Sequence, residues 1–239
     1  MVDKKTLFIG FEGADGSGKG TQFALARDRL RREGFSVGEL DFPQYGRKSA
    51  VFVERYLNGA YGTDVDGFRG TVFYALDRFD AFFNQEEGPS LIDRFHEHDF
   101  WLTNRYVTSN MGHQAGKAQS PEERERILKF IEHLEYDVLA LPKPDDVFFL
   151  YVHPITAQRL VDQKEERTYT TKKRDLHEAD INHLRQAVDS YRYVAQREGW
   201  TTIDCMVPDS DPHDDISTCV RSINDIHEEI YAHILRKIS

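Results

Sequence analysis

The chain has 239 residues and is acidic, with a formal net charge of −10 and a pI of about 5.5. Hydrophobic residues make up 39% of it, which is enough for a sizeable core. The acidic balance argues against a general nucleic-acid-binding protein, since such proteins are usually basic. The longest strongly apolar stretch, residues 147–152, is far too short to cross a membrane. We therefore expect a single domain over residues 1–239 that binds neither nucleic acid nor a membrane.

Short apolar runs alternate with amphipathic segments along the chain. Five runs predict buried strands at residues 5–11, 36–42, 99–106, 146–152 and 200–205. The other segments predict helices at residues 21–34, 64–85, 120–139, 177–199 and 215–238, with a further helix opening at Pro154. Residues 120–139 form the clearest helix, because Ser120, Pro121 and Glu123 fit an N-cap, a first helical position and a capping box. This alternation is typical of βαβ units around a parallel sheet.

The first predicted strand runs directly into the glycine-rich stretch "FEGADGSGKGTQ", residues 11–22. Gly13 is followed after four residues by Gly18 and Lys19, between a strand and a helix, which is the context of a phosphate-binding loop. Glycines let the backbone wrap an anion, and the first N–H groups of the helix point at it. We expect the loop to bind a nucleoside triphosphate through Gly13, Gly16, Ser17, Gly18, Lys19, Gly20 and Thr21.

Four further stretches are informative together with this loop. They are "DFPQYG" (41–46), "FYALDRFD" (73–80), "NRYVTSNMGHQAGK" (104–117) and "SINDIHEEI" (222–230). In order and spacing the five stretches resemble the thymidylate kinases, the family that phosphorylates dTMP with ATP, and the resemblance runs from about residue 5 to residue 232. It implies a P-loop kinase fold, a three-layer α/β sandwich with a five-stranded parallel sheet flanked by helices. It also implies a cytoplasmic homodimer.

The resemblance implies an acceptor site with named residues. Arg78 and Arg105 carry forked donors suited to phosphate, and the matching arginines of the family hold the acceptor phosphate. Tyr74 matches the aromatic residue on which thymine stacks. Asn110 and Gln114 match positions near the edge of the pyrimidine.

Four more positions complete the implied acceptor site. His113 matches a residue beside the sugar, where it disfavours a 2′-hydroxyl group. Phe42 and Pro43 match a dipeptide that lines the acceptor pocket, and Asp15 matches an acid that approaches the acceptor sugar and magnesium.

Structural roles compete with these functional ones. Tyr74 fits a core position, because aromatic residues at helical spacing usually pack inside. Arg78 fits a solvated partner of Asp77 or Asp80, and His113 fits a residue that merely packs.

A charged segment, residues 163–176, lies where the family carries its lid. Phosphoryl transfer needs positive charge over the moving phosphate. Some thymidylate kinases place an arginine in the glycine loop, but that position here is Gly16, so we expect the lid to supply it. The catalytic candidates are therefore Lys19, Asp15 and Arg105 together with Arg167 or Arg174, whose lid neighbours are Lys164, Lys172 and Lys173.

Two departures from the family affect the metal. The family has Asp-Arg at the end of the third strand, where this chain has Asn104 and then Arg105, and Gly20 lacks the hydroxyl that many loops offer to Mg²⁺. We expect Mg²⁺ to be held mainly by phosphate oxygens and water. No direct ligand is certain, and Asp15 and Glu12 are the nearby acidic candidates.

The sequence thus predicts an ATP-dependent, Mg²⁺-requiring kinase that converts dTMP to dTDP in dTTP biosynthesis. A kinase of another pyrimidine nucleotide, such as dUMP or UMP, or of a deoxynucleoside is an alternative. A non-catalytic nucleotide-binding regulatory protein is a second alternative, suggested by Asn104 and Gly20, but Lys19 and Arg105 argue against it.

Overall fold

The computed structural model describes residues 6–86, 88–167 and 181–238. Its centre is one five-stranded sheet in the order β2-β3-β1-β4-β5, and every neighbouring pair of strands is parallel. The strands are β1 (Leu7–Glu12), β2 (Val37–Asp41), β3 (Phe100–Asn104), β4 (Asp146–Tyr151) and β5 (Thr201–Asp204). The predicted fold class is confirmed.

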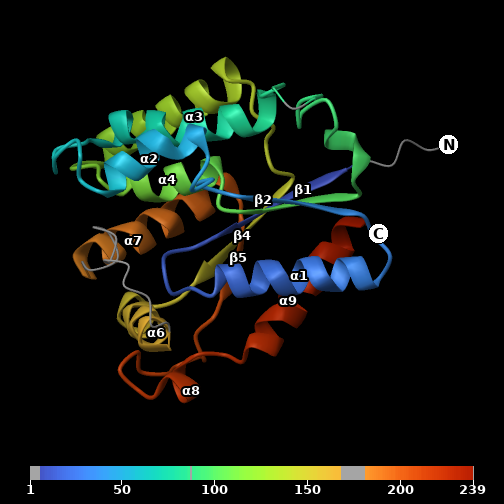
Figure 1. Ribbon diagram of the computed structural model, residues 1–239. Helices are drawn as coiled ribbons and strands as arrows, with labels where there is room; N and C mark the ends of the chain where they lie inside the picture. Colours follow the sequence, from blue (N-terminus) through green and yellow to red (C-terminus); the bar gives the residue numbers. More distant parts are fainter. Residues whose placement is uncertain (1–5, 87, 168–180, 239) are drawn as a thin grey trace.

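Helices cover both faces of this sheet. The α-helices are α1 (Lys19–Arg32), α2 (Val51–Leu57), α3 (Gly67–Phe83), α4 (Val107–Ala115), α5 (Pro121–Ile131), α6 (Pro154–Arg167), α7 (Ile181–Glu198), α8 (Ile216–Cys219) and α9 (Ile223–Ile238). Shorter segments are the 3₁₀ turns η1 (Lys48–Ala50) and η2 (Phe95–Glu97) and the π-helical η3 (Glu132–Val138). Helices α1 and α9 lie on one face of the sheet, with α2, α3 and α4 beyond the other (Figure 1).

Alternation along the strands divides the core between these two faces. In β1, Ile9 and Phe11 point to the face under α1 and α9, where they join a cluster with Leu30 and Ile230. Phe8 points to the opposite face and packs with residues of α3, α4 and α5. Successive side chains of a strand point to opposite faces, so a strand buried on both sides reads as a continuous apolar run.

Two predicted helices are interrupted. The helix predicted at 120–139 has its Ser120 N-cap, which accepts a hydrogen bond from the Glu123 backbone at 3.2 Å, but it widens into the π-helical η3 from Glu132. The helix predicted at 215–238 breaks at Val220, which instead forms an antiparallel bridge with Met206. Backbone hydrogen bonds to the segment after β5 hold this break, since Val207 donates to the Cys219 carbonyl and Arg221 donates to the Cys205 carbonyl, each at 2.9 Å.

Two helices near the site, α2 and α4, were not predicted. They are short, with 7 and 9 residues, and α4 begins directly after the third strand within the stretch interpreted as a motif.

Among the described residues, none of the helices is both long and apolar enough to cross a membrane.

The fold brings the predicted motifs to one edge of the sheet. The carboxyl ends of β1, β2 and β3 meet there, leading into the glycine loop, the Phe42–Pro43 segment and Arg105. In open α/β sheets, ligands bind outside the carboxyl ends of the strands. The candidate site therefore lies at this edge of the sheet.

Candidate active site

The glycine loop has a backbone that only glycine adopts freely at three positions. Gly13, Gly16 and Gly18 have φ values of 152°, 80° and 81°. A Cβ atom on Gly13 would lie 2.8 Å from the Leu150 carbonyl oxygen, and one on Gly16 would overlap the Ala157 carbonyl. Gly18 and Gly20 face open space, so the loop is closed on its inner side and open on the side where α1 begins.

Lys19 begins α1, and no side chain caps this end of the helix. Its ammonium group lies 3.4 Å from the Ala14 carbonyl and 3.3 Å from Asp15 Oδ1. Burial and the charge of Arg105 lower the pKa of Lys19 to about 8, although Asp15 and Glu12 oppose the shift. The free N–H groups of the helix and this lysine form a site suited to an anion.

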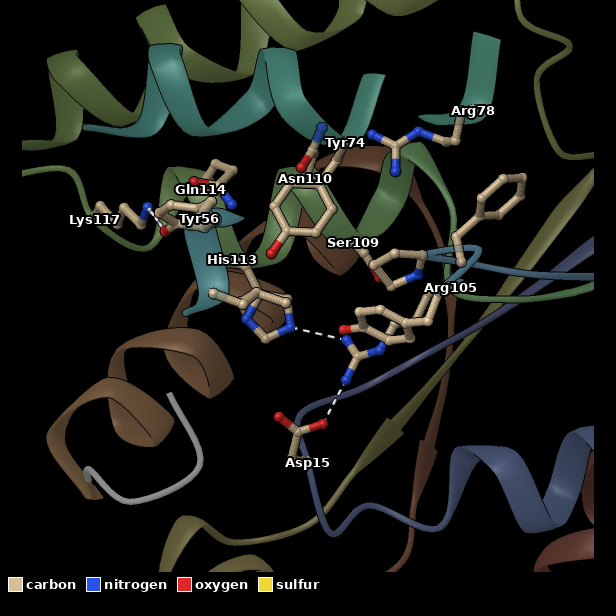
Figure 2. Close-up of a pocket in the computed structure, with 14 residues that line it drawn as sticks. Asp15, Tyr56, Tyr74, Arg78, Arg105, Ser109, Asn110, His113, Gln114 and Lys117 are labelled. Atoms are coloured by element: carbon tan, nitrogen blue, oxygen red, sulfur yellow. Dashed lines mark hydrogen bonds and ion pairs between the residues drawn. The ribbon is translucent and has the colours of Figure 1, made fainter. Parts of the chain in front are cut away.

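Beside the loop lies a cavity of about 130 Å³ (Figure 2). All nine predicted acceptor residues line it, namely Asp15, Phe42, Pro43, Tyr74, Arg78, Arg105, Asn110, His113 and Gln114. The sequence analysis missed five further lining residues, which are Tyr45, Tyr56, Leu57, Ser109 and Lys117.

Arg105 defines the end of the cavity nearest the loop. Figure 2 shows its guanidinium between two partners, Asp15 and the ring of His113. Burial alone would raise the pKa of the Asp15 carboxyl, but the charges of Arg105 and Lys19 outweigh it and hold the pKa well below its usual range. Arg105 Nη1 lies 3.0 Å from His113 Nε2. Since arginine can only donate, this hydrogen bond needs Nε2 as its acceptor.

Arg78 lies at the opposite end, and its surroundings correct the structural alternative considered for it. It is 1% exposed, and its Nε and Nη2 atoms donate to the two carboxylate oxygens of Glu135 at 2.6 and 2.8 Å. It is therefore neither solvated nor paired with Asp77 or Asp80. Asp77 instead accepts from the Gln44 backbone and from a serine hydroxyl, which holds the loop after Pro43 in place.

Glu135 also fixes Asn110. The Asn110 amide nitrogen donates to Glu135 Oε1 at 2.7 Å and to the Thr71 carbonyl at 3.2 Å. Glu135 is fully buried and comes from η3, where the π-helical turn directs it into the space between α3 and α4. Nothing in the sequence distinguished it, because the surrounding charged run is typical of a solvated helix face.

The third corner of the cavity holds Gln114 and Lys117. The Lys117 ammonium group donates to the Tyr56 hydroxyl at 2.6 Å and to a backbone carbonyl, and burial lowers its pKa to about 8. Gln114 packs so closely on α3 that a Cβ atom on Gly70 would overlap its Oε1. These contacts join α4 and the segment after it to α2 and α3. No motif in the sequence links these elements.

Glu12 is one of the two acidic residues expected near Mg²⁺, and its carboxylate already has protein partners in the structure. It is fully buried, and four groups donate to its carboxylate: the Tyr106 backbone and the hydroxyls of Thr108, Ser109 and Tyr191, at 2.6 to 3.0 Å. Its oxygens are thus occupied by donors from α4, α7 and the turn before α4. Glu12 joins these elements to β1.

Asn104 lies beside Asp41, the last residue of β2. Its amide nitrogen donates to Asp41 Oδ1 at 2.9 Å, while its Oδ1 is buried without a partner among the described residues. Partial burial raises the pKa of Asp41, and the Asn104 hydrogen bond and the charges of Arg105 and Lys19 oppose that rise. Asp41 therefore belongs to the electrostatic surroundings of the loop.

The structure does not describe the charged side chains of the predicted lid. Residues 168–180, with Arg174, Lys172 and Lys173, lie outside the described residues, as do the side chains of Arg167 and Lys164 at the end of α6.

Comparisons with known proteins agree with this geometry. A family model described as thymidylate kinase matches residues 11–216. The chain belongs to the thymidylate kinase family. Relatives named thymidylate kinase include one from Mycobacterium tuberculosis (strain CDC 1551 / Oshkosh), 26% identical over 81% of this chain and 87% of its own. Another, from Plasmodium falciparum (isolate 3D7), is 25% identical over 95% of each chain. A probable thymidylate kinase from Pyrobaculum aerophilum is 27% identical over 82% and 87%, respectively.

Family membership confirms the predicted enzyme class. The chain is a nucleoside monophosphate kinase of the thymidylate kinase family, whose reaction is the phosphorylation of dTMP. Such a reaction needs one site for each of two nucleotides, and the glycine loop and the cavity beside it are the candidates.

The pKa of Lys19 leads to a pH dependence. Below pH 8 the ammonium form dominates in the free enzyme, and above pH 8 the neutral amine does. ATP favours the ammonium form, so its affinity should fall as the pH rises through about 8, and binding at pH 8.5 should take up protons. Calorimetry of ATP binding in buffers of different ionisation enthalpy measures this uptake. It should disappear in Lys19→Gln, and equal uptake in both proteins would exclude Lys19 as its source.

Proposed function

We propose that the chain transfers the γ-phosphate of ATP to the phosphate of dTMP held in the described cavity. The base would lie at Asn110 and Arg78, and the acceptor phosphate at Arg105. The observation that carries this orientation is the pair of hydrogen-bonding atoms that Glu135 leaves free.

Asn110 offers an acceptor. Its two amide hydrogens are directed at two groups that can only accept, Glu135 Oε1 and the Thr71 carbonyl. The amide atom that faces these two acceptors must be the nitrogen. The other atom, Oδ1, receives no hydrogen bond from a described residue.

Arg78 offers a donor beside this acceptor. Glu135 occupies its Nε and Nη2 atoms, and Nη1 has no hydrogen-bond partner among the described residues. An acceptor next to a donor matches the N3–H and O4 of thymine or uracil. Cytosine presents the reverse pattern at these two atoms and would leave both protein groups unpaired, which costs about 1–3 kcal/mol for each buried group.

This orientation replaces the expectation that Arg78 and Arg105 share the acceptor phosphate. Arg78 already has a buried carboxylate on two nitrogens, whereas Arg105 lies beside the loop and its Lys19. We propose Arg105 as the phosphate ligand, Tyr74 as the surface on which the base stacks, and Phe42 and Pro43 as the apolar contact of the thymine methyl. One buried methyl group contributes about 0.8 kcal/mol, so preference for dTMP over dUMP from this contact alone is only several-fold.

His113 and Gln114 complete the proposed acceptor site. The His113 ring is fixed by Arg105 and by an edge contact with Tyr191 at 5.3 Å between ring centroids. A fixed ring at that place would disfavour a 2′-hydroxyl on the sugar. Gln114 would contact the base on the side away from Arg78.

The reaction itself requires little covalent chemistry from the protein. A phosphate oxygen of the acceptor, ionised near neutral pH, forms the new bond to the γ-phosphorus, and the bond to the β–γ bridging oxygen breaks to release ADP. Lys19 and the first N–H groups of α1 hold the transferred phosphate. Asp15 keeps Arg105 and Lys19 in place, since both donate to its Oδ1. An arginine of the lid, Arg167 or Arg174, remains our proposal for the charge above that phosphate.

Mg²⁺ with ATP is the proposed cofactor, and the donor set fits it. No three His, Cys, Asp or Glu residues among those described are arranged to bind a metal, but oxygen atoms are available near the loop. Ser17 Oγ and Asn104 Oδ1 are buried and have no partner among the described residues, and Asp15 and Asp41 are carboxylates. When bound, Mg²⁺ would neutralise charge on the β- and γ-phosphates.

We also propose a homodimer in the cytoplasm. Val72, Leu76 and Phe79 lie four and three residues apart on α3 and are 37, 44 and 40% exposed. This spacing puts them on one helical face, away from the cavity side that carries Tyr74 and Arg78. Such an apolar face suits a second copy of the chain.

The base orientation is tested by substrate selectivity. Glu135→Gln should lower kcat/KM for dTMP about 30- to 150-fold, or about 2–3 kcal/mol, because it disorders Arg78 and Asn110 together. Its control is Glu132→Gln in the same η3 segment, where Glu132 pairs with Arg197 near the surface and no change is expected. Wild-type enzyme that phosphorylates dCMP as well as dTMP would refute the orientation.

A second variant tests the orientation without breaking the buried ion pair, so misfolding does not confuse the result. Asn110→Ala removes the proposed N3 contact but leaves the Arg78–Glu135 pair intact. It should reduce the preference for dTMP over dCMP while circular dichroism and Tm stay near wild type.

The dimer is tested separately by light scattering after gel filtration. Leu76→Glu places a charge on the exposed α3 face and should yield monomers. Ile238→Glu, a similar change at an exposed α9 position, should leave the dimer intact. A monomeric wild-type protein would contradict the proposal.

A further inference from the structure

The ends of strands β2 and β3 carry a side-chain pair that the family resemblance does not explain. Asp41 and Asn104 are neighbours in the strand register and share a hydrogen bond of 2.9 Å. β3 also pairs with β1, where Phe11 lies opposite Asn104, one residue before Glu12 and two before the loop glycine Gly13. The pair therefore lies at the sheet edge from which the phosphate-binding loop begins.

The carboxylate that the family resemblance leads one to expect at position 104 is present one strand away. Asn104 is an amide, and Asp41 on β2 supplies a carboxylate next to it. We propose that Asp41 takes over the role of the missing acid, and that Asp41 and Asn104 together accept hydrogen bonds from the water shell of the Mg²⁺ bound with ATP. This inference rests on the proposed function and assigns the metal contacts within the same site.

The hydrogen bond between the two residues determines which atoms are free. The Asp41 carboxylate can only accept, so the Asn104 nitrogen must face it and the Asn104 Oδ1 must face elsewhere. That oxygen is buried and has no partner among the described residues. A buried polar atom without a partner is costly, and an incoming donor would remove the cost.

The Asp41 carboxylate also has a free oxygen. Only Oδ1 receives a hydrogen bond from a described residue, and the side chain, although partly buried, remains open to solvent at the edge of the sheet. Asn104 Oδ1 and Asp41 Oδ2 thus form a pair of adjacent acceptors. Metal-bound water is a strong donor, and Mg²⁺ keeps several of its waters when it binds to proteins.

Other features of the loop agree with contacts through water. The position after Lys19 is Gly20, which offers no hydroxyl and faces open space. Glu12 is already occupied by four donors, and Asp15 Oδ1 accepts from both Arg105 and Lys19. Asp41 forms no ion pair with a described residue, although the charges of Arg105 and Lys19 reach it.

The test measures metal binding rather than turnover. Mn²⁺, which is paramagnetic, replaces Mg²⁺, and electron paramagnetic resonance gives its Kd for the enzyme complexed with a non-hydrolysable ATP analogue. Asp41→Asn should weaken this affinity about 3- to 10-fold, the range for loss of a water-mediated contact. Asn104→Ala should have a similar effect, and the double variant should be little weaker than either single one, because the two residues act as a unit.

Asp28→Asn on the exposed surface of α1 is the matched control, since it removes the same charge away from the pair. It should bind Mn²⁺ as wild type does. Wild-type Mn²⁺ affinity in Asp41→Asn would overturn the inference, and so would an equal loss in Asp28→Asn, which would indicate a general charge effect.

A separate titration of dTMP without metal distinguishes this inference from the proposed function. Asp41→Asn should bind dTMP as wild type does, because Asp41 does not line the cavity. Failure of wild-type protein to bind dTMP would contradict the proposed function. The Mn²⁺ result would still decide the role of Asp41.

Discussion

A carboxylate that is removed completely from water must receive hydrogen bonds from the protein, and two such carboxylates organise this structure. Glu12 at the end of β1 collects donors from α4, α7 and the turn between β3 and α4. Glu135 in η3 collects donors from α3 and α4. The first therefore fixes the cavity relative to the glycine loop, and the second fixes the wall that would contact the base.

The need to satisfy buried charges also makes the two ends of the cavity chemically different. At one end, Arg105, Asp15 and Lys19 form a partly buried group of charges in which each member has an opposite charge beside it. At the other end, Glu135 binds Nε and Nη2 of Arg78 and the amide nitrogen of Asn110, and leaves Arg78 Nη1 and Asn110 Oδ1 without hydrogen-bond partners among the described residues. A phosphate suits the first end and a keto-pyrimidine edge suits the second, which is why the two arginines have different proposed roles.

Much of this site could be predicted from the sequence, because its residues belong to short motifs at strand ends. Four motifs supplied the nine predicted side chains that line one cavity: the glycine loop, the stretch around Phe42, the Tyr74-x-x-x-Arg78 spacing and the motif around Arg105. Glu135 and Lys117 could not be found in this way, since their partners lie on other elements. The π-helical turn that directs Glu135 inward is not encoded by a periodic pattern. The sequence did not single out Asp41, because the role proposed for it depends on the register between two strands.

The orientation of the acceptor is the central claim, and a crystal structure of the enzyme with dTMP measures it most directly. The predicted result has thymine N3 within hydrogen-bonding distance of Asn110 Oδ1, O4 near Arg78 Nη1 and the phosphate on Arg105. A phosphate bound to Arg78, or a base whose N3 and O4 face away from Asn110 and Arg78, would contradict it.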